Sequence, residues 1–427
     1  MLDLQSLREH PDEVVERLTR RGGAFESRIR VILDHDRERR DALTRVNELK
    51  AQRNETSRRI GELKRAGEEA SAMIVEMREV GEAIAELDER VREAEAVIAE
   101  ELAGLPNLPA EVVPVGGEEA NRVVDHSGEP AAFDFAPRPH WEIAEALGIL
   151  DLPRGAKISG SGFPVLVGRG ARLQRGLIDF FLNRHTRHSG YVELRVPYFV
   201  TREAMTGTGQ LPKFAEESYH AERDDLWAIP TAEVPVTNMH RDEILEIEDL
   251  PVRYTASTPC FRREAGAAGR DTRGLLRVHQ FDKVELVRYE TPERSAEALE
   301  EMVHEAGWLL DALELHWRRV ELATADLGFS ASRTFDLEVW APGVEQWLEV
   351  SSVSDFGDFQ ARRAGLRYRP SAGAKPRFLH TLNGSALALP RVMAALLETG
   401  QQRDGSVVLP AVLAEVLDFD RLEPSGD

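Results

Sequence analysis

The chain has 427 residues, of which 42% are hydrophobic and 30% charged, and its formal net charge is -21. Such a length allows two or three domains with at least one large core, and the composition is that of an ordinary globular protein. The acidic balance argues weakly against a nucleic-acid-binding protein, unless the basic residues are segregated along the chain.

A single cysteine, Cys260, excludes an intramolecular disulfide and a cysteine-based zinc cluster, so we expect no zinc. The N-terminus lacks the basic-then-apolar layout of a signal peptide. No apolar run approaches the roughly 20 residues needed to cross a bilayer. We therefore expect a cytoplasmic protein with no membrane association.

Residues 1–105 are dense in Glu, Arg, Ala and Leu and nearly free of proline after Pro11. Their spacing predicts an N-terminal domain with two long helices over about 28–102, joined near Gly67, which is suited to a helix end. So short a turn makes the helices antiparallel, each offering the other its apolar stripe. The heptad positions of the second helix are Met73, Met77, Val80, Ile84, Leu87, Val91, Ala94 and Ile98.

Charge divides between these two helices, since the first is rich in arginine and the second in glutamate. Solvated faces and inter-helix ion pairs explain most such residues. A basic edge that follows a phosphate backbone is the alternative, and charge alone favours the simpler explanation.

A Pro- and Gly-rich linker over 106–137 precedes a third zone, 138–427, which mixes helix and strand patterns. Consecutive strands with helices set apart predict an antiparallel sheet in an α+β domain. The expected helices are Gly170–His188, Glu297–Leu313 and Val392–Leu397, and the expected strands are Tyr191–Pro197, Pro259–Glu264, His279–Val287, Phe335–Trp340 and Gln346–Ser351.

Charged side chains recur at two-residue spacing in these strands, which places each pair on one face of its strand. The pairs are Arg262 with Glu264, Lys283 with Glu285, and Glu349 with Ser351. A structural salt bridge is the likelier reading of any single pair, whereas all of them together indicate a polar active site across the sheet.

The loop Gly266–Arg277 combines flexible glycines with three arginines, which suits binding of a polyanion. The sequence has no P-loop and no dinucleotide-binding Gly-rich turn. Phosphate binding would therefore rest on arginines, with Mg²⁺ held by carboxylates such as Glu349. Arg391 lies near a predicted helix N-terminus, where an anion site and an ordinary surface arginine are equally compatible with the local sequence.

Six motifs in this order resemble the seryl-tRNA synthetase family, and the resemblance covers essentially the whole chain. They are Thr231–Glu233, Phe261–Glu264, Gly269–Gly274, Val278–Glu285, Asp358–Arg363 and His380–Ser385. The resemblance implies a class II synthetase catalytic domain, an antiparallel sheet flanked by helices that works as a homodimer. It also implies that residues 1–105 bind tRNA through the helical hairpin.

The resemblance implies roles for individual residues. Arg262, Glu264 and Arg391 would be catalytic, with Arg262 on the α-phosphate of ATP, Glu264 beside the adenine and Arg391 at the γ-phosphate. Around ATP it also places Arg263, Val278, Phe281, Glu349, Val350, Ser351 and Ser352, with Mg²⁺ on Glu349 and Ser352. The serine pocket would comprise Thr231, Ala232, Glu233, Glu285, Asn383 and Ser385, and the tRNA-binding arm would use Arg39, Arg45, Arg53 and Arg58.

The implied activity is ATP-dependent activation of L-serine to seryl-adenylate, followed by transfer to the 3′ end of tRNA(Ser) and of selenocysteine tRNA where present. Rival hypotheses are a non-catalytic paralogue that binds tRNA or protein, a ligase that loads a carrier protein, and a purely structural coiled coil. Departures from the family pattern at Arg263, Val353, Gly357, Ala386 and Pro390 are compatible with a specialised second copy.

Overall fold

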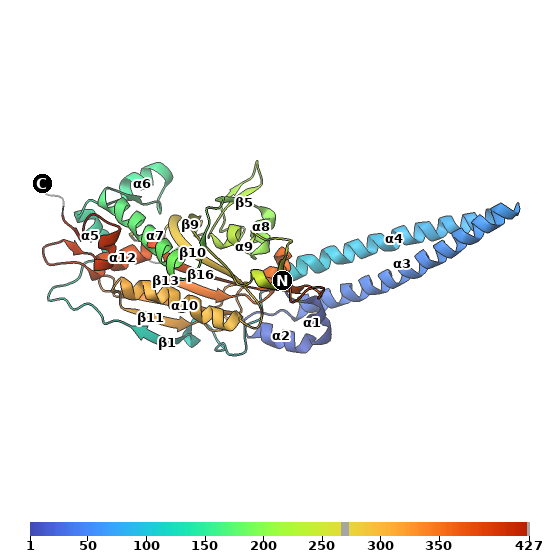
Figure 1. The fold of residues 1–427 in the computed structure, drawn as a ribbon, viewed down its shortest axis with the longest axis horizontal. Coiled ribbons are helices and arrows are strands. Elements are labelled where there is room, and N and C mark those ends of the chain that lie inside the picture. Colours follow the sequence, from blue (N-terminus) through green and yellow to red (C-terminus); the bar gives the residue numbers. More distant parts are fainter. Residues whose placement is uncertain (266–272, 425–427) are drawn as a thin grey trace. The chain divides into compact units, whose positions relative to one another are not determined.

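A computed structural model describes residues 1–265 and 273–424. The chain divides into two compact units (Figure 1). The helical unit comprises Leu2–Thr19 and Gly23–Pro106, and the sheet unit comprises Met1, Arg20–Gly22 and Asn107–Asp427. Within the described residues, no helix combines the length and hydropathy required to cross a bilayer.

The helical unit is built around a long antiparallel helix pair, which confirms the predicted hairpin. Its helices are α1 (Leu4–Glu9), α2 (Pro11–Thr19), α3 (Glu26–Ala66) and α4 (Ser71–Ala103). Gly67 caps α3 in the left-handed region, at φ +75°, where a side chain would be strained. The break between the helices therefore falls at the glycine that the sequence indicates.

The heptad seam between α3 and α4 is buried far from the turn at Gly67 and only half-buried close to it. Val80 and Ile84 of α4 pack against Val46 and Leu49 of α3. Nearer the turn, Met73 and Met77 are only half-buried. Burial of apolar surface therefore decreases toward the tip of the hairpin.

A buried carboxylate ties α1 to α3 at the base of the hairpin. Asp36 is fully buried and pairs with Arg39 at 2.8 Å, Arg40 at 3.0 Å and Arg8 at 3.5 Å. Burial opposes ionisation of Asp36, but hydrogen bonding to Arg39 and the charges of Arg39 and Arg8 outweigh it and lower its pKa.

An eight-stranded sheet forms the centre of the sheet unit, in the order β1-β11-β12-β13-β16-β10-β9-β4. All neighbours are antiparallel except β4 and β9, which are parallel. The strands are β1 (Arg122–Ser127), β4 (Val192–Glu193), β9 (Val252–Phe261), β10 (Gln280–Glu290), β11 (Trp317–Glu321), β12 (Arg333–Ala341), β13 (Gln346–Asp355) and β16 (His380–Ala388).

Three helices pack on one face of this sheet and bury the main core: α7 (Arg169–His188), α10 (Ser295–Ala312) and α12 (Leu389–Thr399) (Figure 1). Val284 and Leu286 of β10 point into that core. Because side chains alternate along a strand, Lys283 and Glu285 point to the opposite face, which is where the polar cavities lie.

Shorter elements surround the sheet. The helices are α5 (His140–Ala146), α6 (Leu152–Ser159), α8 (Arg202–Gly207), α9 (Glu233–Thr237) and α11 (Phe359–Ala364), with 3₁₀ turns at Glu118–Ala120, Ile247–Asp249 and Ala411–Glu415. The small sheets are β2 (Leu150–Asp151) with β3 (Val165–Leu166); β5 (Phe199–Thr201), β6 (His220–Ala221) and β7 (Leu226–Ala228); β8 (Ile244–Glu246), β14 (Arg367–Arg369) and β15 (Arg377–Phe378); and β17 (Val407–Val408) with β18 (Arg421–Leu422).

Two strand predictions are wrong in extent. The strand expected over Tyr191–Pro197 is regular only at Val192–Glu193, because it pairs with β9 alone, at the edge of the sheet. The strand expected over Pro259–Glu264 ends at Phe261. Arg262 and Glu264 therefore do not share a strand face, and Glu264 has φ +51°.

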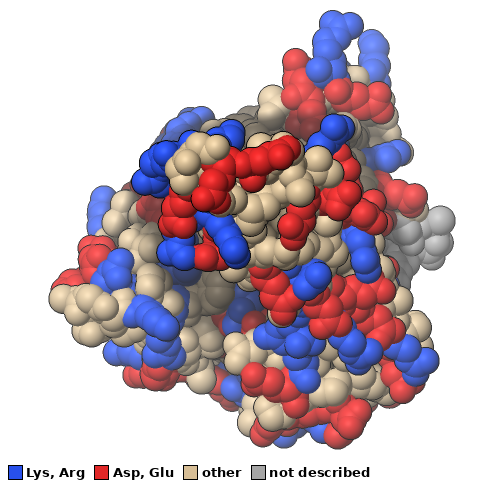
Figure 2. Space-filling view, turned by 90° about the vertical axis from the view of Figure 1, so that its right-hand side faces the viewer, with Lys and Arg blue, Asp and Glu red and all other residues tan. Residues whose placement is uncertain are grey.

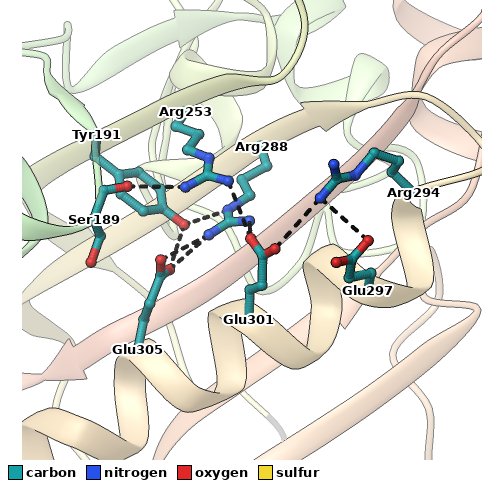
Figure 3. A network of polar contacts seen from close by, with 8 residues as sticks. All are labelled: Ser189, Tyr191, Arg253, Arg288, Arg294, Glu297, Glu301 and Glu305. Atoms are coloured by element: carbon teal, nitrogen blue, oxygen red, sulfur yellow. Dashed lines mark hydrogen bonds and ion pairs between the residues drawn. The ribbon is translucent and has the colours of Figure 1, made fainter.

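A buried ion network joins β10 to α10 on the face of the sheet that the helices cover (Figure 3). The guanidinium of Arg288, fully buried, donates to Tyr191 Oη at 2.6 Å, Glu301 at 2.6 Å and Glu305 at 2.9 Å. Burial opposes the charge of Arg288, but the facing oxygens raise its pKa above the ordinary value. Arg253 of β9 joins the network through Glu301 at 3.2 Å. The network holds β10 on the side opposite the polar cavities.

Candidate active site

Two adjoining polar cavities lie on the exposed face of the large sheet. The larger, about 440 Å³, is reached by Thr231, Glu233 and Asn383. The smaller, about 310 Å³, is lined by Val278, Phe281, Val350 and Arg391, among others. The two cavities share Arg262, Glu264, Lys283, Glu349 and Ser385. They are therefore described as one site with two lobes, the acidic lobe and the arginine lobe.

Two buried carboxylates lie at the acidic lobe, Glu233 in its lining and Glu285 behind that lining. The side-chain amide of Asn383 donates to Glu233 Oε2 at 3.0 Å and to Glu285 Oε1 at 2.8 Å. Gln360 of α11 donates to the other oxygen of Glu233 at 2.6 Å. Burial, and secondly the charge of Glu285, raise the pKa of Glu233 to about 7. Such a pair of buried carboxylates suits recognition of a small cation, such as an ammonium group.

A buried lysine completes this lobe. Lys283 Nζ lies 2.6 Å from Glu285 Oε2, and its side chain is only 6% exposed. Sequence reasoning placed Lys283 on the correct face but gave it no role in the site. The two-residue spacing to Glu285 was the available signal, since a charge inside a sheet needs a partner.

Arg262 lies between the two lobes. Its guanidinium lies over the Phe281 ring, 5.3 Å from the centroid, and its Nε donates to the Pro230 carbonyl at 3.4 Å. Glu264 is paired with Arg277. An aromatic ring beside two arginines fits a base with a polyphosphate.

Arg391 is positioned by α12 and by two backbone carbonyls. Its Nε donates to Leu276 O at 3.2 Å and its Nη1 to Glu349 O at 2.8 Å. Pro390 is the second residue of α12 and lies in its first turn, where its fixed φ is tolerated. Arg391 thereby joins the end of the loop before β10 to the edge of β13.

Oxygen donors gather where β12 and β13 border the site. Glu349 and Ser352 both line the larger cavity. Asp336 faces Ser352 across the strand pair. Its Oδ1 is shielded from solvent and has no hydrogen-bond partner among the described residues. Burial and the Glu349 charge raise the pKa of Asp336 well above its ordinary value. Carboxylate and hydroxyl oxygens are ligands that Mg²⁺ prefers, so the donor set fits that ion.

The predicted pairing of Glu349 with Ser351 on one face is wrong, because a bulge interrupts β13. Glu338 faces Glu349 and Leu337 faces Ser351, so Val350 is the extra residue. The bulge brings Glu349 and Ser352 to the site and leaves Ser351 buried, with its hydroxyl on the Ser385 carbonyl.

Most residues that the resemblance implied for the site line the cavities, and four do not. Glu285 is buried behind the lining, where Asn383 and Lys283 contact it. Ala232 and Ser351 are buried outside both linings, and Arg263 is exposed, with its guanidinium on the Glu216 carbonyl at 3.2 Å. Most of the predicted phosphate-binding loop lies outside the described residues, which resume at Arg273.

No sequence pattern predicted one wall of the larger cavity. That wall comes from irregular segments: Thr208, Gln210, Phe214, Ser218, Gly328, Phe329, Ser330, Ala331 and Phe356. Irregular segments follow neither helical nor strand periodicity, so the direction in which their side chains point cannot be deduced from residue spacing.

Three of the four predicted arm arginines pair with carboxylates of the helical unit. Arg45 lies 2.8 Å from Glu48 and Arg58 lies 2.6 Å from Glu55. Arg39 pairs with Asp36, and Arg53 is half-buried. Figure 2 shows basic and acidic side chains interspersed over the face in view. Ion pairing within the helical unit thus accounts for most of these arginines, and their side chains still lie at least partly at the surface.

Comparison with known proteins agrees with this geometry. The model described as "tRNA synthetase class II core domain (G, H, P, S and T)" matches residues 215–400, the stretch that carries most of the cavity lining. The "Seryl-tRNA synthetase N-terminal domain" matches residues 1–109. The sheet and its site thus define a class II aminoacyl-tRNA synthetase core.

Relatives narrow the class to one family. A serine–tRNA ligase of Thermomicrobium roseum is 54% identical over 97% of this chain and 92% of its own length. One from Geobacillus kaustophilus is 51% identical over 97% of both chains. The crystal structure of seryl-tRNA synthetase from Pyrococcus horikoshii complexed with ATP is 37% identical, with a TM-score of 0.95 over all of both chains. The chain belongs to the seryl-tRNA synthetase family.

Proposed function

We propose that this chain is a serine–tRNA ligase that uses both lobes of the site in sequence. In the first step L-serine and ATP give seryl-adenylate and pyrophosphate. In the second, a ribose hydroxyl at the 3′ end of tRNA(Ser), or of selenocysteine tRNA, takes the seryl group and AMP leaves. The observation that carries the proposal is the Glu233–Asn383–Glu285 cluster, of which Glu233 and Asn383 line the same cavity as Arg262.

Serine binding follows from the donors and acceptors of the acidic lobe. Glu233 and Glu285 neutralise the serine ammonium, and Thr231 and Ser385 complete the pocket around its hydroxyl, with Asn383 holding both carboxylates in place. Alanine leaves these buried polar groups unpaired, which a hydrogen-bonding site penalises by about 10⁴–10⁵-fold.

Activation needs no nucleophile from the protein, because the serine carboxylate attacks the α-phosphorus itself. Arg262 contacts that phosphate and Arg391 the γ-phosphate end, while Phe281 stacks on the adenine, with Glu264 beside it. The chain's contribution is alignment of the two substrates and stabilisation of the charge that develops on phosphate oxygens. Glu349 and Ser352 would hold Mg²⁺, which supplies further neutralisation of the triphosphate.

We also propose the organisation implied by the resemblance: a tRNA-binding domain over 1–105, a linker over 106–137 and a catalytic domain over 138–427. Cytoplasmic location and homodimer formation belong to the same proposal. Support for the dimer comes from apolar side chains exposed on the sheet unit, such as Val192 on the edge strand β4, 57% exposed, and Ile158 on α6, 74% exposed.

Amino-acid-dependent ATP–pyrophosphate exchange tests the proposal, with serine, threonine, alanine, glycine and cysteine compared. Strong exchange with serine alone is expected. Absence of exchange with all five would contradict ligase activity, and preference for another amino acid would contradict the serine assignment.

A further inference from the structure

The segment Leu327–Ser332 connects β11 to β12 and forms one wall of the larger cavity. Gly328, Phe329, Ser330 and Ala331 all line that cavity. The segment has no regular strand or helix structure. Its shape must therefore come from hydrogen bonds to other parts of the chain.

Arg21 supplies three of these bonds. Its Nη2 donates to Leu327 O at 2.9 Å and to Gly328 O at 2.7 Å, and its Nη1 donates to Ala331 O at 3.0 Å. Burial lowers the pKa of the Arg21 guanidinium to about 10. The three hydrogen bonds to carbonyls offset the lost hydration of this guanidinium, because a hydrogen bond from a charged donor is stronger than one between two neutral groups.

Asn107 and Ala110 donate to the other carbonyls of the segment. The backbone amide of Asn107 donates to Phe329 O at 2.9 Å, and its side-chain amide donates to Ser330 O at 2.9 Å and to Phe356 O at 2.8 Å. The amide of Ala110 donates to Ser332 O at 2.9 Å. Each of the six consecutive carbonyls from Leu327 to Ser332 thus accepts from Arg21, Asn107 or Ala110.

The donors have a particular place in the chain. Arg21 lies in Arg20–Gly22, immediately before the chain enters the helical unit at Gly23. Asn107 is the first residue after that unit ends at Pro106. One wall of the active site is therefore held by the two junctions through which the chain leaves and re-enters the sheet unit.

The proposed function assigns no residue of this wall to serine or to ATP, so this side of the larger cavity has no assigned substrate. Phe214, Phe329 and Phe356 line the cavity, and nucleic-acid bases stack on such rings. The second reaction step needs a third substrate there, the terminal nucleoside of the tRNA.

We propose that Arg21 and Asn107 are positioning residues for the transfer step, which hold Leu327–Ser332 as the wall that receives the terminal nucleoside of tRNA. The inference rests on the proposed function. Neither residue touches the reacting atoms; both act through the backbone that they hold.

The test separates the two half-reactions in the full-length protein. Arg21→Met keeps the side-chain length but removes all donors, and Arg21→Lys restores one cationic donor group. Exchange with serine reports activation, and a single-turnover reaction of preformed enzyme–seryl-adenylate with tRNA(Ser) reports transfer. Arg369→Met is the matched control, since Arg369 donates to the carbonyl of Ala374, in a loop that lines neither cavity.

Arg21→Met is expected to slow transfer by about tenfold or more, because a small displacement of a reacting group is costly. Exchange and the dissociation constant for tRNA should stay near the unaltered protein's values, with partial recovery of transfer in Arg21→Lys. Asn107→Ala should slow transfer in the same way, and it keeps the test valid if Arg21→Met does not fold.

Equal loss of exchange and transfer would overturn the inference, because the wall would then serve activation or the fold as a whole. Unchanged transfer in both Arg21→Met and Asn107→Ala would overturn it as well. Failure of the proposed function is distinguishable, since the unaltered protein would then show no serine-dependent exchange at all.

Discussion

Charged residues are frequent in both units, but they serve different purposes in the hairpin and in the sheet. Along α3, Arg58 pairs with Glu55 while both side chains remain more than 60% exposed. In the sheet unit Arg288 is fully buried, and its guanidinium donates to Tyr191, Glu301 and Glu305. Exposure, more than the number of ion pairs, decides what each pair contributes.

The physical reason is the cost of removing a charge from water. An exposed pair exchanges one set of hydrogen bonds for another and contributes about 0–1 kcal/mol. Removing one partner of a buried pair leaves an uncompensated charge and costs about 3–5 kcal/mol. The exposed hairpin charges therefore remain available to a partner, whereas the buried charges of the sheet unit are committed to structure or to the site.

The largest expected effect is on stability, in Arg288→Met. Loss of the guanidinium leaves the Glu305 carboxylate without its cation and the Tyr191 hydroxyl oxygen without a donor, so the free energy of unfolding should fall by about 3–5 kcal/mol. All six tryptophans lie in the sheet unit, so fluorescence during urea unfolding reports that unit alone.

Arg294→Met is the matched control from the same network (Figure 3). Arg294 also pairs with Glu301, at 3.6 Å, but its side chain is 52% exposed. A loss of about 0–1 kcal/mol is expected. Similar losses in the two variants would show that exposure does not separate the two kinds of pair.

The next effect is catalytic. Arg262→Ala should lower kcat/KM for serine-dependent exchange by about 10²–10³-fold, the usual cost of removing one donor from a developing oxyanion. Arg263→Ala, one residue along, should leave exchange nearly unchanged because Arg263 lines neither cavity. Comparable losses in both would contradict the assignment of Arg262 to the phosphate.

A smaller effect is the pH dependence of serine binding. The pKa of Glu233 is raised to about 7, so this carboxyl is neutral below that pH and ionised above it. KM for serine in the exchange reaction should therefore fall as pH rises from about 6 to about 8. Glu233→Gln should remove this pH dependence, and an unchanged profile in that variant would assign the titration to another group.

The raised pKa of Glu233 also makes stability depend on pH. Stability falls as pH rises, whereas serine binding strengthens. The folded state holds the Glu233 proton more tightly than the unfolded state does. This group's contribution to stability is therefore present below the ordinary carboxyl pKa and declines as pH rises through about 7.

The smallest effect on stability is expected in the hairpin. Arg58→Gln should change the free energy of unfolding by about 0–1 kcal/mol. It should nevertheless weaken tRNA binding and reduce the slope of log affinity against log salt by about 1, the loss of one phosphate contact. Arg78→Gln on α4, an arginine 83% exposed and outside the predicted basic edge, should leave tRNA affinity unchanged. A larger loss of tRNA affinity in Arg78→Gln than in Arg58→Gln would place the tRNA contact on α4.

The hairpin was the part of the fold most open to prediction. Its heptad repeat and Gly67 are local signals, so the spacing of Val80, Ile84 and Val91 already specified the packed face. In the sheet unit the alternation along β10 likewise put Lys283 and Glu285 on one face.

Prediction failed where geometry departs from a regular period. The bulge at Val350 removes Ser351 from the face on which two-residue spacing placed it with Glu349, and β9 ends before Arg262. Arg21 and Asn107 contact a wall more than 200 residues away in the sequence, as their separations from Leu327 and Ser330 show. No local pattern carries such information.

The most direct test of the division of labour is to replace residues 28–102 with a short Gly–Ser linker and measure both half-reactions. Serine-dependent ATP–pyrophosphate exchange should persist, because both cavities are lined by sheet-unit residues. Charging of tRNA(Ser) should be abolished. Charging at the full rate without the hairpin would contradict its role as the tRNA-binding element.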